Sequence, residues 1–178
     1  MKIYTKTGDK GDTRLFDGTV VRKNDSRVDT YGEVDELNAV LGAAGAFLQD
    51  TELKSILCDI QRDLFSVGAV LADPRHRGGK EKSKLDPARV TTLEQTIDRF
   101  ETELPPLRQF ILAGGGPAGA LLHVARTVCR RAERRVVALA NVEEVDPVIV
   151  EYLNRLSDFL FVMARLVNTR QGQQEIPW

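Results

Sequence analysis

Positive charge is concentrated in residues 126 to 135, which read Arg-Thr-Val-Cys-Arg-Arg-Ala-Glu-Arg-Arg. On a helix that turns by about 100° per residue, three arginines and the glutamate share one face: Arg126, Arg130, Glu133 and Arg134. Guanidinium groups fit phosphate oxygens through paired hydrogen bonds, so this face is suited to a polyanion. The same spacing also suits a solvated stripe of ion pairs. Helical spacing alone leaves both interpretations open.

A second group of phosphate-binding residue types lies near the start of the chain, from Thr5 to Arg14. The stretch Thr-Lys-Thr-Gly-Asp-Lys-Gly-Asp-Thr-Arg offers backbone N–H groups, hydroxyl donors and lysine charge to a phosphate chain. It lacks the GxxxxGK[ST] spacing of a P-loop, and no strand or helix pattern brackets it. A frayed, charged terminus would have the same composition, so the stretch by itself does not decide.

Polar residues also lie on two further helical stretches. Glu151, Asn154, Ser157 and Asp158 form a stripe that either faces solvent or lets Asn154 offer its amide to a ligand between helices. Asp35 is either an ordinary surface acid or one half of an ion pair between subunits. Composition decides neither case.

Two familiar motifs are excluded by their context. Gly114 to Gly119 fits GxGxxG, but the helix after it leads to another helix and not to a parallel strand, so a dinucleotide fold is not expected. These glycines instead let a loop turn tightly into a helix whose N-terminus favours anions. Neither histidine has a glutamate three residues earlier, as a di-iron bundle requires. We expect His76 to lie in a mobile, charged loop over residues 75–84, and His123 to be a surface or packing residue.

Length and composition limit the class of protein. The 178 residues suit one domain, and 25 Lys and Arg against 26 Asp and Glu give a net charge of −1. This balance argues against a partner such as nucleic acid or an anionic membrane surface. Cys58 and Cys129 have no CxxC spacing, which excludes a cysteine zinc site and fits a reducing cytoplasm. The sequence shows no secretory signal and no stretch of 18 apolar residues, so we expect a cytoplasmic protein without membrane spans.

Helical periodicity predicts an all-α fold, a five-helix antiparallel bundle in a single domain over residues 1–178. The expected helices are Thr30–Phe47, Thr51–Leu71, Asp86–Leu104, Ala118–Ala140 and Pro147–Arg170. Residues 1–29 have no helical period and are interpreted as an irregular N-terminal binding segment with a short strand or two. The bundle occupies residues 30–171, and residues 172–178 are a tail.

Taken together, five motifs in order resemble those of the PduO-type ATP:cob(I)alamin adenosyltransferases, the corrinoid adenosyltransferases. They are Tyr-Thr-Lys-Thr-Gly-Asp-Lys-Gly at 4–11, Tyr-Gly-Glu-Val-Asp-Glu-Leu-Asn at 31–38, Phe-Ile-Leu at 110–112, Val-Cys-Arg-Arg-Ala-Glu-Arg at 128–134 and Tyr-Leu-Asn-Arg-Leu-Ser-Asp at 152–158. Each motif is weak alone, but their joint order over nearly the whole chain is specific.

The resemblance implies a homotrimer that binds ATP between adjacent subunits. The implied nucleotide site consists of Thr5, Lys6, Thr7, Gly8, Thr13, Arg14, Lys23, Arg130, Arg131, Glu133, Arg134 and Asn154. Arg126 and Asp35 match a salt bridge between subunits at the active site, where Arg130 also acts. Arg131 falls outside the arginine face of the ideal helix, which suits either contact from a neighbouring subunit or a different helix phase.

The resemblance also implies the reaction, the transfer of the 5′-deoxyadenosyl group of ATP to cob(I)alamin, with Co(I) as the nucleophile and triphosphate as the leaving group. Mg²⁺ is expected on the ATP phosphates and not in a protein metal site. Phe110 matches the residue that keeps the lower face of the corrin cobalt free of a ligand, although Ala113 stands where the family often has proline.

Partners and competing functions remain open. A reductase and an adenosylcobalamin-dependent client enzyme are possible partners that the sequence does not identify. The alternatives are a non-catalytic, nucleotide-binding helical regulator or adaptor, and a nucleic-acid-binding module that uses the arginine helix. The net charge disfavours the second alternative.

Overall fold

The structure is a computed structural model, and it describes residues 3, 4, 6–73 and 84–178. The described residues form two short strands and five helices: β1 (Asp12–Arg14), β2 (Val20–Arg22), α1 (Ser26–Phe47), α2 (Thr51–Leu71), α3 (Ala88–Glu101), α4 (Pro117–Ala140) and α5 (Pro147–Arg170). The expected five-helix, all-α fold is therefore confirmed. Of the segment 75–84, expected to be a mobile loop, only Lys84 belongs to the described residues, and His76 lies outside them.

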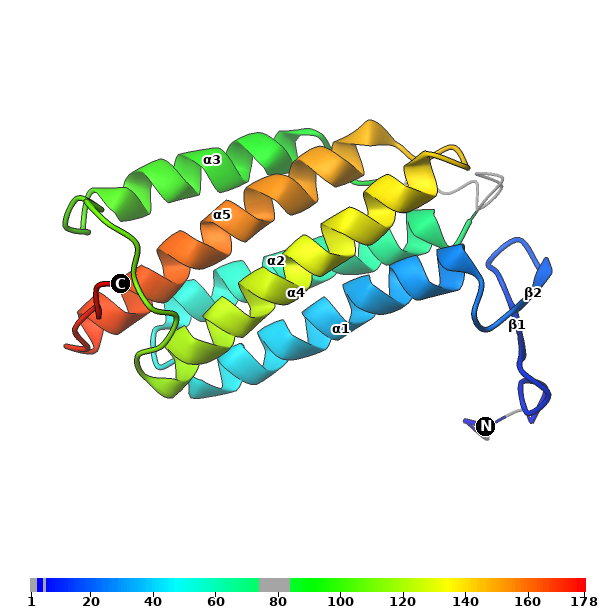
Figure 1. Ribbon diagram of the computed structural model, residues 1–178, viewed down its shortest axis with the longest axis horizontal. Helices are drawn as coiled ribbons and strands as arrows, with labels where there is room; N and C mark the ends of the chain where they lie inside the picture. The colour runs from blue at the N-terminus through cyan, green and yellow to red at the C-terminus, as the bar shows by residue number, and fades with distance from the viewer. Residues whose placement is uncertain (1–2, 5, 74–83) are drawn as a thin grey trace.

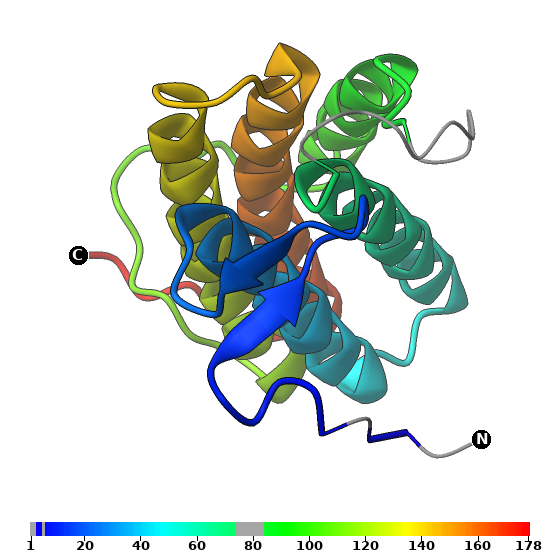
Figure 2. The ribbon, with the colours of Figure 1, turned by 90° about the vertical axis from the view of Figure 1, so that its right-hand side faces the viewer.

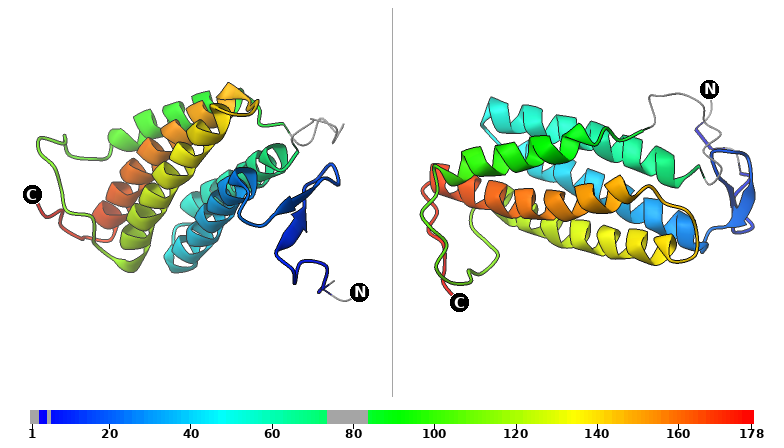
Figure 3. Two further views of the ribbon diagram at one scale, coloured as in Figure 1. Left: turned by 45° about the vertical axis from the view of Figure 1, so that its right-hand side comes forward. Right: turned by 90° about the horizontal axis from the view of Figure 1, so that it is seen from above.

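The helices run lengthwise beside one another, and α1 packs against both α2 and α4 while α5 packs against α3 and α4 (Figure 1). β1 and β2 form an antiparallel hairpin, with Thr13 opposite Val21, that lies across one end of the bundle (Figure 2). The loop between α3 and α4 and the segment after α5 lie at the other end (Figure 3). None of the described helices has the length and apolar character needed to cross a membrane.

The apolar positions that repeat along each helix form one core. Leu37 and Leu41 of α1, Ile60 of α2 and Leu153 of α5 are each at most 1 % exposed. Burial of a side chain of this size contributes about 1.5–3 kcal/mol. α5 is buried along most of its length because α3 covers one side of it and α4 another, so it is the central helix of the bundle.

Three predicted helix boundaries are wrong by two to four residues, and one of them is the start of α3, at Ala88 and not at Asp86. α1 begins at Ser26 and not at Thr30, because the Asp25 carboxylate accepts the Arg27 N–H at 2.8 Å and caps the helix. Arg27 is buried and binds the Glu143 carboxylate and the Leu71 carbonyl, contacts that no periodicity reveals. α3 ends at Glu101 and not at Leu104, since residues 102–104 form tighter turns with i to i−3 hydrogen bonds.

Residues 172–178, expected only as a tail, are tied to the loop between α3 and α4. The Leu112 N–H donates to the Ile176 carbonyl at 2.8 Å, and the Trp178 N–H donates to the Phe110 carbonyl at 2.9 Å. These two hydrogen bonds form a short antiparallel bridge around Ile111 and Pro177. The segment after α5 therefore has a defined position in the fold.

A buried polar network joins three helices. The Tyr152 hydroxyl of α5 donates to the Asp63 carboxylate of α2 at 2.9 Å, and Arg89 of α3 donates to the same oxygen at 2.8 Å. Burial, followed by the charge of Asp63, raises the pKa of Tyr152 well above its ordinary value. The network fixes how α2 and α3 sit on the central helix.

We expect Tyr152→Phe to lower the free energy of unfolding by about 2 kcal/mol, because it removes a buried hydrogen bond to a charged group. Urea unfolding at pH 7 measures this. Tyr31→Phe is the control, since the Tyr31 hydroxyl makes no hydrogen bond within the described residues. Equal stability of the two variants would show that the network contributes nothing.

The stabilisation that the Tyr152 hydroxyl provides should depend on pH. The folded protein keeps the Tyr152 proton where the unfolded chain loses it, near pH 10. The hydroxyl therefore stabilises the fold fully below about pH 10 and progressively less above it. The difference in unfolding free energy between the unaltered protein and Tyr152→Phe should shrink as the pH rises past this value.

Candidate functional site

A groove with arginine side chains runs between α4 and α5. One hollow, of about 290 Å³, is lined by Arg130, Glu133, Arg134, Val137 and Asn154. A second hollow, of about 280 Å³, is lined by Ile97, Glu101, Arg126, Arg130, Ser157, Asp158, Phe161 and Val162. Arg130 lines both hollows, so the two adjoin and form one surface. The shared helix face that the sequence predicted is therefore present.

Glu101, Glu133 and Asp158 line the two hollows, but in the part of the chain that the structure describes none of them forms an ion pair with the groove arginines. Among the described residues, Arg126, Arg130 and Arg134 form no ion pair with a carboxylate, and Arg134 donates only to the Arg130 backbone carbonyl, at 3.0 Å. The Arg126 Nε atom is buried without a hydrogen-bond partner. Burial, and then the nearby charge of Arg130, lower the pKa of Arg126. This geometry disfavours a stripe of mutual ion pairs and favours an anion site.

Glu133 and Asn154 meet across the groove. The Asn154 side-chain N–H donates to a Glu133 carboxylate oxygen at 3.1 Å, which fixes both groups beside Arg130 and Arg134. Ser157, one turn further along α5, is buried and donates to the Asn154 carbonyl at 2.9 Å. Of the polar stripe on α5, Ser157 is buried, whereas Glu151, Asn154 and Asp158 are exposed. Asn154 lines the hollow, so both solvent and a ligand in the groove can reach it.

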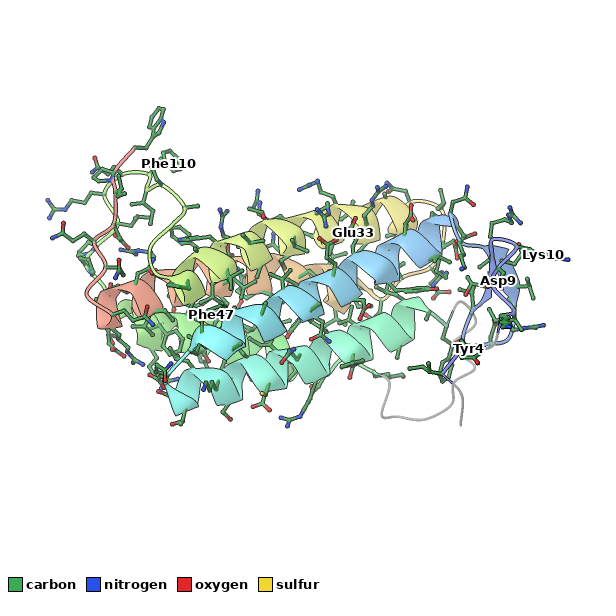
Figure 4. All side chains as sticks on the ribbon, turned by 90° about the horizontal axis from the view of Figure 1, so that it is seen from below. Tyr4, Asp9, Lys10, Glu33, Phe47 and Phe110 are labelled. Atoms are coloured by element: carbon green, nitrogen blue, oxygen red, sulfur yellow. The ribbon has the colours of Figure 1, made fainter. Side chains whose placement is uncertain are left out.

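Arg131 occupies a different side of α4 and is engaged by its own chain. It donates to Glu33 at 2.5 Å and also to Glu36, and these hydrogen bonds raise its pKa. Figure 4 shows Glu33 on α1 facing α4. The sequence correctly separated Arg131 from the other arginines. Within the described residues, however, its partners are these two glutamates, so the expected role of Arg131 toward a nucleotide has no geometric support in the single chain.

The N-terminal candidates converge on a separate hollow beside the hairpin. This hollow, of about 560 Å³, is lined by Thr7, Gly8, Asp12, Thr13, Arg14, Val20 and Lys23. A Cβ atom at Gly8 would lie only 3.1 Å from the Lys23 ammonium nitrogen, so glycine allows the lysine to approach the backbone. Lys6 lies outside this lining, with its ammonium 5.9 Å from the Tyr4 ring. Thr5 is outside the described residues.

The remaining two candidates, Asp35 and Phe110, are both exposed. Asp35 lies on the exposed surface of α1 and forms no ion pair within the described residues. Phe110 is 79 % exposed, and its ring meets that of Trp178 edge-on at 6.5 Å. Phe110 projects from the end of the bundle opposite to Tyr4, Asp9 and Lys10 (Figure 4). Since α4 has 24 residues and is about 36 Å long, the two ends cannot meet within one chain.

The groove contains no activated nucleophile among the described residues. Cys129 is buried, its thiol donates to the Leu153 carbonyl at 3.2 Å, and burial raises its pKa far above the usual value. His123 is buried with Nδ1 unpartnered, and burial, then Arg126, lower its pKa, so it is neutral at pH 7. The packing role expected for His123 is thus confirmed. No three His, Cys, Asp or Glu side chains in the described part of the chain are grouped as metal ligands.

Sequence reasoning missed several residues at these surfaces. Val137 and Phe161 line the groove one helical turn beyond Glu133 and Ser157, and this spacing could have identified them. Trp178 is the single tryptophan of the chain and packs on Phe110. Its position after the last helix gave no periodic signal that could have linked it to residue 110.

Comparisons with known proteins show the family to which this chain belongs. The family model described as cobalamin adenosyltransferase matches residues 3–167. The chain belongs to this family. A corrinoid adenosyltransferase from Bacillus subtilis (strain 168) is 46% identical over 182 residues, which cover 100% of this chain and 92% of that protein.

Solved structures of the family have the same fold. A variant PduO-type ATP:corrinoid adenosyltransferase from Lactobacillus reuteri, complexed with cobalamin and ATP, matches with a TM-score of 0.94 and 38% identity, over 99% of both chains. A second variant of that type from the same organism, complexed with ATP, matches with a TM-score of 0.91 and 39% identity, again over 99% of both chains. The resemblance inferred from the five motifs is confirmed.

We expect inorganic tripolyphosphate to raise the melting temperature of this adenosyltransferase-family protein, because a ligand of the folded state stabilises it. Arg130→Ala should weaken that binding by about 1.5–3 kcal/mol, the value of a hydrogen bond to a charged group. Titration calorimetry gives the affinity.

Arg62→Ala is the matched control for this measurement, since Arg62 is an exposed arginine on α2 that pairs with Asp59, away from the groove. The affinity of Arg62→Ala for tripolyphosphate should equal that of the unaltered protein. An equal loss in both variants would mean that the anion binds by net charge and not in the groove.

Proposed function

We propose that this chain transfers the 5′-deoxyadenosyl group of ATP to cob(I)alamin, giving adenosylcobalamin and triphosphate. One observation carries the proposal: the α4 groove of a cobalamin adenosyltransferase-family chain holds three arginines without carboxylate partners among the described residues, beside the Glu133–Asn154 pair. A site built in this way is electrostatically incomplete until an anion with several charges binds. ATP, as the donor substrate, supplies such an anion.

The nucleotide contacts two surfaces, the α4 groove and the hairpin hollow. Arg130 and Arg134 bind phosphate oxygens, and Asn154 with Glu133 offers hydrogen bonds to the rest of the nucleotide. The hairpin hollow adds hydroxyl, backbone N–H and lysine groups from the other surface. The nucleotide roles of Thr5, Lys6 and Arg131 rest on the family resemblance alone. Mg²⁺ binds the phosphate oxygens, where it offsets negative charge with few protein ligands.

A second subunit completes the site. The hairpin hollow and Phe110 lie at opposite ends of one chain (Figure 4), so a nucleotide and a corrinoid that touch both need surfaces from two copies. Arg126 has a buried Nε without a partner, and Asp35 is an exposed carboxylate without a cation among the described residues. We infer that these two groups pair across the subunit boundary of a homotrimer.

The chemistry requires positioning more than proton transfer. The Co(I) of the corrinoid substrate donates its electron pair to the 5′ carbon of ATP. A cobalt–carbon bond forms as the carbon–oxygen bond to the triphosphate breaks, and the bonding electrons leave with the triphosphate oxygen. Preorganised guanidinium groups stabilise the charge that develops on this leaving group. Holding the two substrates in line supplies the rest of the rate enhancement. This mechanism needs no protein nucleophile or base, in agreement with the inert Cys129 and the neutral His123.

Phe110 acts on the step before transfer. Co(II) is easier to reduce when it has no lower axial ligand, and a bulky apolar ring in that space keeps the ligand away. Phe110 is exposed enough to enter such a space on a bound corrinoid. The electrons come from a reductase, and the product serves an adenosylcobalamin-dependent client enzyme. The two free cysteines fit a reducing cytoplasm as the place of action.

Formation of adenosylcobalamin from ATP, Mg²⁺ and chemically reduced cob(I)alamin, followed by absorbance, tests the proposed function directly. Tight binding of ATP without product would instead indicate a non-catalytic nucleotide-binding regulator.

In the same assay we expect Phe110→Ala to leave ATP affinity nearly unchanged but to slow the reaction sharply when it starts from Co(II)alamin and a reductant. If Phe110→Ala and the unaltered protein react at equal rates from Co(II)alamin, Phe110 does not have the proposed role.

We also expect Asp35→Asn and Arg126→Ala to lower kcat/KM, because each leaves the other charge unpaired at the subunit boundary. The double variant should show a coupling energy of about 0.5–3 kcal/mol, as groups in direct contact do. Asp98→Asn, which changes a carboxylate on α3 outside the proposed pair, is the control. Additive effects of Asp35→Asn and Arg126→Ala would show that these residues do not interact.

A further inference from the structure

Phe110 has few contacts that fix the direction of its ring. It lies in the segment 102–116 between α3 and α4, where the bridge at Ile111 is the one strand-like pairing with any of the described residues. Its side chain is 79 % exposed, so the core does not hold it. A ring that must occupy one defined space beside a ligand needs another source of order.

The segment after α5 is the first source of order. The Trp178 N–H donates to the Phe110 carbonyl at 2.9 Å. The Leu112 N–H donates to the Ile176 carbonyl at 2.8 Å. The Trp178 ring then lies edge-on to the Phe110 ring, with interplanar angle 83°. Because Trp178 is itself 86 % exposed, this segment in turn depends on an anchor elsewhere.

Arg165 of α5 is that anchor. Its guanidinium donates to both oxygens of the Glu175 carboxylate, at 2.6 and 3.3 Å, and to the Pro105 carbonyl at 2.9 Å. The Arg165 side chain is only 4 % exposed, and that of Glu175 is 21 % exposed. One buried cation therefore joins the start of the Phe110 segment to the segment after α5. Neither of its two partners belongs to a helix.

Asn168, one turn beyond Arg165, holds the other end of the Phe110 segment. Its side-chain N–H donates to the Gly114 carbonyl at 2.9 Å, and its oxygen accepts the Gly116 N–H at 3.2 Å. Gly115 has φ +104, and a Cβ atom there would collide with the Asn168 side chain. Both ends of the segment are thus fixed to α5. Its centre is fixed by the backbone pairing with residues 176–178, which follow Glu175.

We propose that Arg165 is a positioning residue for Phe110, acting through Glu175 and the backbone pairing of residues 176–178. The consequence for the reaction rests on the proposed function, whereas the ordering of the segment does not. Arginine suits this task because its planar fork binds a carboxylate and a carbonyl at once. Loss of the fork leaves helix packing intact but frees Trp178 and, with it, Phe110.

Trp178 provides a direct measurement, because it is the single tryptophan of the chain. Time-resolved fluorescence anisotropy of the unaltered protein should be dominated by overall tumbling. Glu175→Ala, which removes both carboxylate oxygens that Arg165 binds, should add a fast component from local motion of the indole. Glu175→Gln, which keeps one acceptor oxygen, should restore part of the slow decay. Arg165→Gln should match Glu175→Ala, and circular dichroism checks that the variants are folded.

Adenosylation provides the second measurement. Glu175→Ala should slow the reaction roughly tenfold when it starts from Co(II)alamin, since small misplacements of a positioned group are costly, and should change the rate from pre-reduced cob(I)alamin much less. Arg155→Gln is the matched control, because Arg155 is an α5 arginine that also binds two carboxylates, Glu94 and Asp158, away from both segments. It should leave the anisotropy decay unaltered.

The outcomes separate this inference from the proposed function. An immobile indole in Glu175→Ala overturns the inference. A mobile indole with undiminished Co(II)alamin turnover also overturns it, provided that Phe110→Ala is slow in the same assay. If Phe110→Ala is as fast as the unaltered protein, the role proposed for Phe110 fails, and the anisotropy result still decides whether Arg165 orders the segment.

Discussion

The positive charge that α4 presents to α5 is the feature on which the rest of the structure depends. Arg126, Arg130 and Arg134 repel one another, and none of them is neutralised by a carboxylate within the described chain. Packing of the buried face of α4 against the central helix α5 holds them together in spite of this repulsion. Burial, and then the charge of Arg130, lower the pKa of Arg126, the direction expected where holding these charges together has an electrostatic cost. An anionic substrate relieves that cost, so affinity and fold stability oppose each other here.

α5 connects the parts of the molecule that serve function. Its Tyr152 fixes α2 and α3 through Asp63, and its Asn154 holds Glu133 in the groove. Further along, Arg165 and Asn168 hold the segment that carries Phe110. These four polar side chains lie at different positions around a helix whose other residues are largely buried. A single helix therefore relates the arginine groove to the exposed phenylalanine.

The length of the bundle explains why the proposed reaction requires more than one copy. The β1–β2 hairpin lies at one end of the bundle (Figure 1), and Phe110 projects from the opposite end (Figure 4). Groups that lie far apart within a rigid chain become neighbours when copies pack side by side in different directions. The buried, unpartnered Nε of Arg126 and the exposed Asp35 supply opposite charges for such a boundary. Geometry and electrostatics together thus support the proposal that the site needs more than one copy of the chain.

The sequence by itself determined the five helices, their buried faces and the shared face of Arg126, Arg130, Glu133 and Arg134, because helical periodicity is a local property of the chain. The five motifs also determined the family. The start of α1 at Ser26 rests on a local cap by Asp25, which helical periodicity does not register. Only the tertiary structure decided that Arg131 binds Glu33 and Glu36 and that residues 176–178 pair with residues 110–112. Both depend on contacts between residues distant in sequence, whose partners follow from how the helices pack and not from any spacing along the chain.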